Sequence, residues 1–150
     1  MGKIMTQDGF ISRHGGYKNL LSYKKAEIIY DATVYFTGRF FDRRDRTVDP
    51  MVQAARSGKQ NIIEGSMASA TSKESEIKLT NVARASLEEL LEDYRDFLRV
   101  NGHAEWSASY PYARRLRELN RKSDAGYETF RKGIEHEDPS ICANIIIGLI

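Results

Sequence analysis

The chain has 150 residues, of which 29% are charged and 41% hydrophobic, and its formal net charge is +2 at pH 7. This length suits one domain with a buried core, and the composition is that of a globular protein. The single cysteine, Cys142, excludes an internal disulfide and favours a reducing compartment. The opening residues lack the apolar core of a signal peptide, and the apolar run 145–150 is too short to span a membrane, so we expect no membrane association.

Charge is unevenly distributed along the chain. Residues 1–60 carry 11 Lys and Arg against 6 Asp and Glu, whereas residues 61–110 carry 5 against 9. The split predicts one basic and one acidic surface, which suits either nucleic-acid contact or head-to-tail self-association. Charge alone does not choose between the two.

Residues 1–16 show little periodicity and contain two adjacent glycines, which predicts a flexible arm in front of a single domain at 17–150. Helical spacing then begins, with Ser22 as the expected N-cap, and continues to about Phe41. One face of this first helix is apolar. It carries Ile28, Ile29, Ala32, Tyr35, Phe36 and Phe40.

A second helix is predicted to start at Asp49-Pro50, because proline suits the first helical position and the residue before it avoids helical angles. Gly65 is the expected end of this helix. Its packing stripe includes small residues that would let a partner helix approach closely. The stripe is Met51, Ala55, Gly58 and Ile62.

The third helix is expected to begin with a capping box of Thr71 and Glu74 and to run to about Val100, where Asn101-Gly102 stops it. Two faces are distinguished by their side chains. The apolar face carries Leu79, Ala83, Leu87, Leu90, Tyr94 and Phe97, and the opposite face carries Glu88, Glu92 and Asp96.

The C-terminal part predicts a short basic helix at 112–120, another helix at 127–137, and a helical run capped by Asp138-Pro139. No segment has the pattern of a strand pair. We therefore predict an all-α fold: an antiparallel, up-and-down four-helix bundle with an extra helical insertion between helices 3 and 4.

Catalytic and metal-binding motifs are missing. A di-iron bundle needs Glu-x-x-His, but Ile11, Val100 and Gly133 stand three residues before the histidines. Cys142 lies in an apolar run, where a thiol usually acts as a small hydrophobe. The carboxylates of the third helix are typical of a solvated face. We predict no catalytic residue, no metal site, no cofactor and no enzymatic activity.

Three basic clusters are candidates for binding phosphates, because exposed Lys and Arg side chains release counterions when they contact a nucleic-acid backbone. They are Arg43, Arg44 and Arg46; Arg56 and Lys59; and Arg114, Arg115 and Arg117, which Arg121 and Lys122 extend. The alternative is a solvated surface that pairs with the acidic third helix. Arg56 has a further alternative, an inward ion pair with Glu64 or Glu89.

The stretch QNIIEGS at 60–66 sets polar residues beside two isoleucines. A reactive site is one interpretation. The interpretation we favour is an internal polar brace between the second and third helices, because Ile62 belongs to the packing stripe. The brace would consist of Asn61, Glu64, Arg84, Ser86 and Glu89.

The segments QAARSGKQNIIEGS and TSKESEIKLTNVARASLEELLEDYRDFLR together resemble the four-helix-bundle family of 23S rRNA intervening-sequence proteins, in the four helix bundle suffix domain branch. The similarity covers roughly residues 17–150. The matching positions are Arg56, Asn61, Ile62, Glu64, Gly65, Ala83, Arg84, Ser86 and Glu89.

The resemblance implies a bacterial, cytoplasmic, all-α protein that assembles as a homopentamer, and it carries over no catalytic residue. The related accessory protein of diversity-generating retroelements binds nucleic acid and a reverse transcriptase through a basic surface. The segment 103–126 is longer than the family's connection, and the run after Asp138 is shorter than expected.

We therefore predict a non-enzymatic, homo-oligomeric bundle protein that binds RNA or DNA through basic surfaces, with a reverse transcriptase or another neighbouring gene product as a further candidate partner. The alternative is a protein–protein interaction or scaffold module without nucleic-acid binding.

Overall fold

The computed structural model describes residues 17–150, with side chains from Leu21 onward, and the regular elements in that range are all helices. The elements are α1 (Tyr17–Phe40), α2 (Val48–Ala68), α3 (Lys73–Val100), α4 (Pro111–Asn120), α5 (Tyr127–Ile134) and α6 (Pro139–Leu149). The all-α prediction is confirmed for this range. The predicted arm at 1–16 lies outside the described residues. None of the helices described is both long and apolar enough to cross a bilayer.

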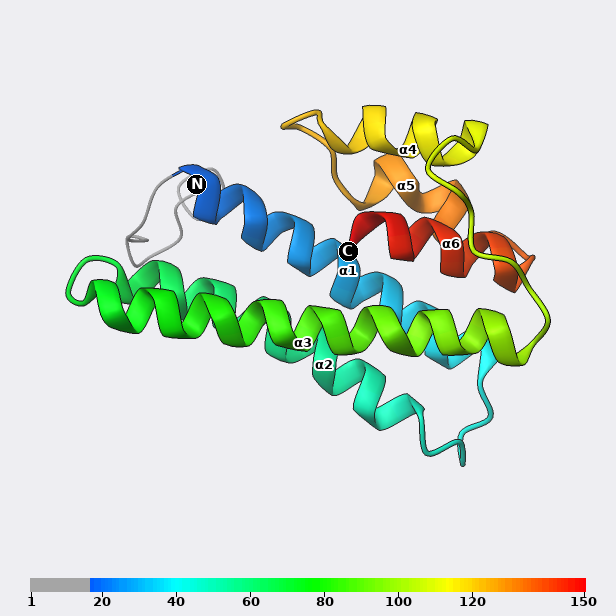
Figure 1. Ribbon diagram of the computed structural model, residues 1–150, viewed down its shortest axis with the longest axis horizontal. Coiled ribbons are helices and arrows are strands. Elements are labelled where there is room, and N and C mark those ends of the chain that lie inside the picture. The colour runs from blue at the N-terminus through cyan, green and yellow to red at the C-terminus, as the bar shows by residue number, and fades with distance from the viewer. Residues whose placement is uncertain (1–16) are drawn as a thin grey trace, which may run out of the picture.

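Three long helices form the body of the molecule (Figure 1). Helix α2 packs against both α1 and α3, and α6 lies against α1 and α3. The short helices α4 and α5 pack on α6, so they form an additional layer beyond it (Figure 1). The segment between α3 and α5, where an inserted helix was predicted, contains one helix, α4.

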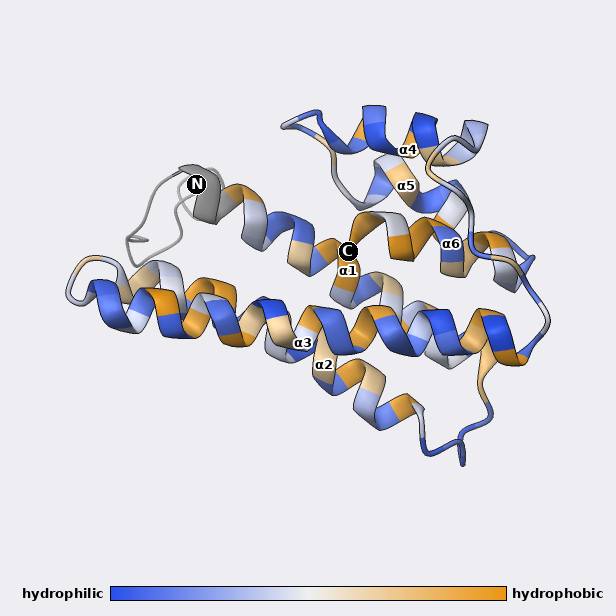
Figure 2. Cartoon of the chain, in the orientation of Figure 1, coloured by the Kyte–Doolittle hydropathy of each residue, from blue (hydrophilic) through white to orange (hydrophobic). Residues whose placement is uncertain are grey.

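The core lies where the hydrophobic faces of the helices meet, while hydrophilic residues occupy the outer faces (Figure 2). Phe36 is its centre: the ring is fully buried and contacts the rings of Phe40, Phe41, Tyr94 and Phe97 at centroid distances of 4.9–5.8 Å. Tyr94 is also fully buried, and its hydroxyl donates to Thr33 Oγ1 at 2.8 Å. Burial raises the pKa of Tyr94, so this phenol stays protonated.

Small residues allow α2 and α3 to lie close together, as the stripe predicted. Met51, Ala55 and Gly58 are buried, and Ile62 is half-buried. A Cβ atom at Gly58 would lie 2.6 Å from Cδ2 of Leu87, which is closer than van der Waals contact allows. Gly58 is therefore explained by interhelical packing.

Several predicted helix ends were wrong. Helix α1 begins at Tyr17, so Ser22 lies inside it and is not its N-cap. Helix α2 begins at Val48, with Asp49 in its first turn, where a carboxylate stabilises the helix dipole. It also continues through Gly65 to Ala68. Gly65 faces α3 at close range, since a Cβ there would lie 3.3 Å from Thr80 Oγ1.

The remaining ends are closer to the predictions. Helix α3 begins one residue later than the predicted box, because Ser72 is the cap and accepts from the backbone N–H of Ser75 at 3.1 Å. Its predicted stop is confirmed, with Gly102 at φ 74°, in the left-handed region. Asp138 caps α6 by accepting from the backbone N–H of Ser140 at 2.8 Å, as predicted.

Candidate nucleic-acid interface

The structure separates the predicted basic clusters. The loop between α1 and α2 lies at the opposite edge of the molecule from α4 (Figure 1). Arg56 and Lys59 belong to α2. A nucleic acid that contacts one of these clusters therefore does not reach all three at once without wrapping around the protein.

The α1–α2 loop exposes its three arginines, Arg43, Arg44 and Arg46. Two aspartates, Asp42 directly before the arginines and Asp45 between Arg44 and Arg46, organise the loop. Asp42 Oδ1 accepts from the backbone N–H of Arg44 at 2.8 Å, and Asp45 Oδ1 accepts from the backbone N–H of Thr47 at 2.9 Å. These carboxylates cancel most of the positive charge of the arginines, which weakens the loop as a phosphate-binding surface.

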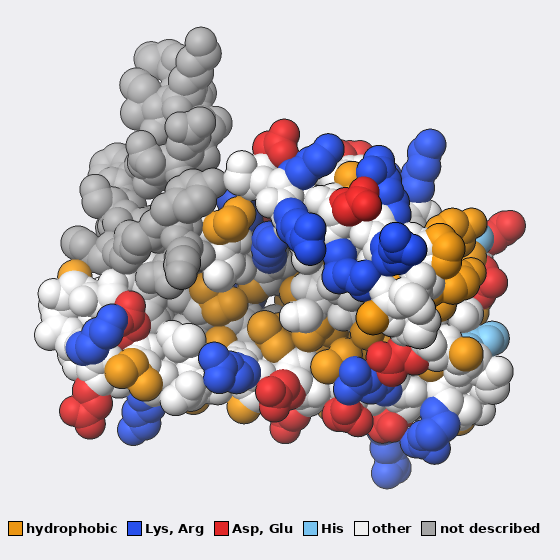
Figure 3. Space-filling view, turned by 45° about the horizontal axis from the view of Figure 1, so that its top comes forward, with side chains coloured by type: hydrophobic (Ala, Val, Ile, Leu, Met, Phe, Trp, Pro, Cys, Tyr) orange, Lys and Arg blue, Asp and Glu red, His pale blue; other side chains and the backbone are white. Residues whose placement is uncertain are grey.

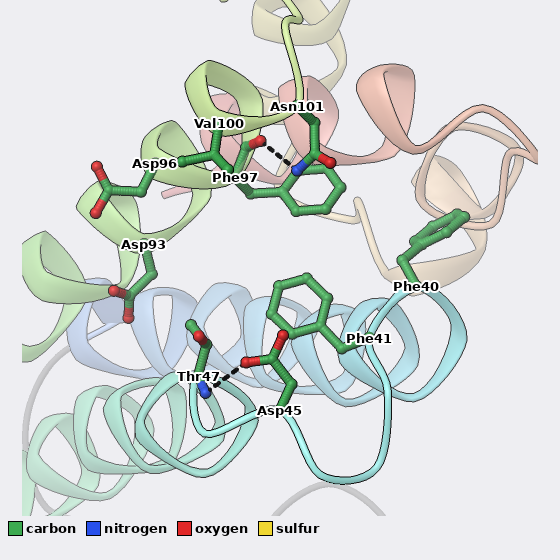
Figure 4. A pocket seen from close by; sticks show the side chains of 9 residues that line it. All are labelled: Phe40, Phe41, Asp45, Thr47, Asp93, Asp96, Phe97, Val100 and Asn101. Carbon is green, nitrogen blue, oxygen red and sulfur yellow. Dashed lines mark hydrogen bonds between the residues drawn. The ribbon is translucent and has the colours of Figure 1, made fainter.

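A pocket of about 400 Å³ opens beside this loop, and Figure 4 shows the side chains that line it. Its acidic lining consists of Asp45 from the loop and of Asp93 and Asp96 from α3, and the rings of Phe41 and Phe97 line it as well. Partial burial, together with the nearby carboxylates, raises the pKa of Asp93. This negative surface repels phosphates and suits a cationic ligand.

The cations of α2 are in different environments. Arg56 is exposed and makes no hydrogen bond or ion pair within the described part of the chain. Lys59 is half-buried, and its Nζ lies 4.6 Å from the centroid of the Tyr30 ring. This cation–π contact ties α2 to α1 and leaves Lys59 less available to a phosphate.

Two further cations of the basic N-terminal part also act within the fold. Lys25 Nζ donates to the carbonyl of Asn120 at the end of α4, at 2.6 Å. Arg39 Nη1 donates to the carbonyls of Glu135 and His136, after α5, at 2.9 and 3.1 Å. Both side chains satisfy carbonyls at helix ends. The net charge of residues 1–60 therefore overstates the free basic surface.

Helix α4 presents Arg114, Arg115 and Arg117, all exposed. Arg115 pairs with Glu118 at 3.3 Å, and Arg117 Nη2 donates to the carbonyl of Ala108 at 2.6 Å. Lys and Arg side chains gather on the face of the molecule that includes α4 (Figure 3). Because α4 contains a single carboxylate, it is the most positively charged of the predicted surfaces.

The segment before α4 contributes residues that the sequence analysis did not single out. Trp106, Tyr110 and Tyr112 form an aromatic cluster next to the arginines. Asn144 of α6 holds this segment in place: its Oδ1 accepts from the backbone N–H of Trp106 at 2.8 Å, and its Nδ2 donates to the carbonyl of Ala104 at 3.1 Å. The spacing of aromatic residues in WSASYPY, directly before ARRLR, is the sequence signal for this arrangement.

The predicted polar brace is brought together in part. Asn61 Nδ2 donates to Ser57 Oγ at 3.1 Å, and Ser57 Oγ is hydrogen-bonded to Ser86 Oγ at 2.8 Å, which links α2 to α3. Ser57 takes part in this hydrogen-bonded link, although it was not among the residues predicted for the brace. The three charged members, Glu64, Arg84 and Glu89, are exposed and make no hydrogen bond or ion pair within the described residues.

The single cysteine is shielded from solvent. Cys142 is fully buried and its thiol donates to the carbonyl of His136 at 2.7 Å. Burial raises the pKa of this thiol to about 11, so it is not a thiolate at neutral pH. Within the described residues, no group of three or more His, Cys, Asp or Glu side chains converges in a way that could hold a metal ion.

Comparisons with protein-family models, with curated proteins and with solved structures find no match to this chain.

Proposed function

We propose that this protein is a non-enzymatic nucleic-acid-binding protein whose main contact surface is α4. One observation supports this most strongly: Arg114, Arg115 and Arg117 are all exposed on a helix of ten residues that contains a single carboxylate. Arg121 and Lys122 follow directly and are exposed as well. Guanidinium groups at this density bind phosphates without regard to base sequence.

The other basic residues take secondary roles in this proposal. Arg43, Arg44, Arg46 and Arg56 are exposed and would contact backbone at the far edge of a long ligand. Lys59 would contribute least, because its ammonium group already lies over Tyr30. Affinity should therefore depend mainly on α4 and only weakly on the α1–α2 loop.

The proposal includes the finer architecture, an antiparallel up-and-down bundle. Its support is the packing of α2 against α1 and α3 and of α6 against α1 and α3, with α4 as the inserted element. Kinship with the 23S rRNA intervening-sequence proteins belongs to the same proposal. We also propose that the protein forms a homopentamer, that it acts in the bacterial cytoplasm, and that a reverse transcriptase is a candidate partner. These rest on the motifs around Arg56 and Arg84.

Fluorescence anisotropy with labelled structured RNA and labelled duplex DNA tests the binding. We expect binding at low salt that weakens steeply between about 50 and 200 mM salt, because each phosphate contact releases counterions. Absence of binding to both probes at 50 mM salt would refute the proposal. Gln replacements at Arg114, Arg115 and Arg117 should weaken binding more than the same replacements at Arg43, Arg44 and Arg46.

A protein–protein interaction module is the second candidate, and the acidic pocket of Figure 4 favours it. Its aspartates and phenylalanine rings suit an arginine or lysine side chain of a partner. A pull-down with the product of a neighbouring gene, compared between wild type and Asp93→Lys, tests this candidate. Capture that is unaffected by Asp93→Lys would contradict a role for the pocket.

A further inference from the structure

An exposed aromatic cluster lies where the α3–α4 connection enters α4. The ring centroids of Trp106, Tyr110 and Tyr112 are 5.2, 5.5 and 5.7 Å apart. Tyr110 is 42% exposed and Tyr112 is 58% exposed, while Trp106 is half-buried. Aromatic rings that are clustered and left open to solvent usually mark a binding surface.

The rings of this cluster differ from other tyrosine rings of the described chain in having no cation over them. Elsewhere in the described chain, cations lie over the rings of Tyr30, Tyr35 and Tyr127. None of the cation–π pairs found among the described residues involves the cluster at 106–112. Its rings meet at interplanar angles of 34°, 66° and 81°, so they present their faces in different directions.

The cluster is held in one arrangement before any ligand binds. Asn144 is only 3% exposed and holds the backbone of Ala104 and Trp106 by two hydrogen bonds. Pro111 starts α4, and Arg117 ties the helix back to the carbonyl of Ala108. A surface that is already ordered loses little conformational entropy on binding.

Positively charged side chains lie near Tyr112 and near the segment that carries Tyr110. Tyr112 and Arg115 line the same apolar pocket of about 230 Å³, together with Lys132 of α5. Arg117 reaches the segment that carries Tyr110, through its hydrogen bond to Ala108. Flat aromatic faces beside guanidinium groups match the two parts of a nucleotide, a stacking base and an anionic phosphate.

We propose that residues 106–117 form a platform for single-stranded nucleic acid, on which unpaired bases stack against Tyr110 and Tyr112 while Arg114, Arg115 and Arg117 contact the phosphates. The inference rests on the proposed function and specifies its ligand. Bases in a duplex are already stacked on one another and present no free face. The platform therefore selects single strands, with little dependence on base identity.

The test uses the intact chain and its single tryptophan, Trp106, whose emission reports on the platform. A thymidine homopolymer of roughly 12 nucleotides, a duplex of the same length and poly-L-glutamate are added in turn at low salt. We expect the single strand to quench Trp106 emission and to bind more tightly than the duplex. An emission that the homopolymer leaves unchanged, or that poly-L-glutamate changes equally, would overturn the platform.

Paired substitutions supply the control. Tyr110→Leu with Tyr112→Leu removes both aromatic faces, and we expect about tenfold or greater weakening of the single strand with duplex binding within about twofold of wild type. Tyr110→Phe with Tyr112→Phe keeps both rings and should bind the homopolymer as wild type does. Equal affinities of the leucine and phenylalanine variants would refute base stacking. If the protein binds the duplex as tightly as the single strand, the platform is refuted but the proposed nucleic-acid binding stands. If it binds neither the duplex nor the single strand, the proposed function is refuted as well.

Discussion

Replacing Asn144 by Ala tests how the aromatic segment is held. The side chain is nearly fully buried and joins α6 to two backbone groups, the N–H of Trp106 at 2.8 Å and the carbonyl of Ala104 at 3.1 Å. A third hydrogen bond, to the carbonyl of Ser140 at 3.0 Å, stays within α6. Alanine removes all three and leaves a small cavity.

The expected loss of stability follows from these contacts. Each hydrogen bond contributes about 1 kcal/mol net, and the higher helix propensity of alanine offsets roughly 0.5 kcal/mol of the loss. The free energy of unfolding should therefore fall by about 2.5 kcal/mol. Urea denaturation followed by circular dichroism should show the midpoint shifted down by about 1 M, for a slope typical of a small domain.

Trp106 provides a second readout of the same change. With its backbone released, we expect its emission to move to longer wavelength in the native state as the ring gains contact with water. Asn81→Ala is the matched control, because Asn81 is exposed on α3 and its replacement should change stability by no more than about 0.5 kcal/mol. If Asn144→Ala is as stable as Asn81→Ala and leaves the emission unchanged, Asn144 does not hold the backbone of Ala104 and Trp106 in place.

Three further predictions concern single groups in the core and the acidic pocket. The pKa of Asp93 is raised in the folded state, so its charged form is disfavoured there and Asp93→Asn should raise the free energy of unfolding at pH 7. The gain should disappear as the pH falls through the raised pKa to below the pKa of an ordinary aspartate, where Asp93 is protonated in both the folded and the unfolded state. Equal gains at neutral pH and at this acidic pH would contradict the prediction. The Cys142 thiol, with its pKa raised to about 11, should react with a thiol reagent at pH 8 only after unfolding in urea, and rapid labelling of the native protein would contradict its burial. Tyr94→Phe removes the buried hydrogen bond to Thr33 and should lower the free energy of unfolding by about 1 kcal/mol in chemical denaturation, whereas an unchanged midpoint would show that this bond contributes nothing.

Helices could be predicted from sequence because their apolar residues recur at helical spacing over long stretches. Their ends were harder to predict, because several residues near each end can act as the cap. Both Thr71 and Ser72 have a hydroxyl that can cap α3, and in the structure Ser72 Oγ accepts the hydrogen bond from the backbone N–H of Ser75. Gly65 was predicted to end α2 but lies within it, on the side that packs closely against α3.

The basic residues were visible in the sequence, but their availability was not. Lys25 and Arg39 bind carbonyls more than ninety positions away, and Lys59 packs on Tyr30. The aromatic platform depends in the same way on Asn144, which lies 38 residues from Trp106. Such contacts arise from packing between helices, and no local pattern around these residues indicates them.

The salt dependence of nucleic-acid binding tests the central claim most directly. Wild type is compared with a variant in which Arg114, Arg115 and Arg117 are all replaced by Gln. The control carries the same replacements at three exposed α3 arginines, so that both variants lose the same net charge. The α3 positions are Arg84, Arg95 and Arg99.

The measurement is the slope of log K against log salt concentration for duplex DNA. Each phosphate contact contributes about 0.9 to this slope, so loss of three contacts should flatten it by about 2.7 in the α4 variant, while the α3 control keeps the wild-type slope. Equal slopes for the two variants would contradict α4 as the phosphate-binding surface.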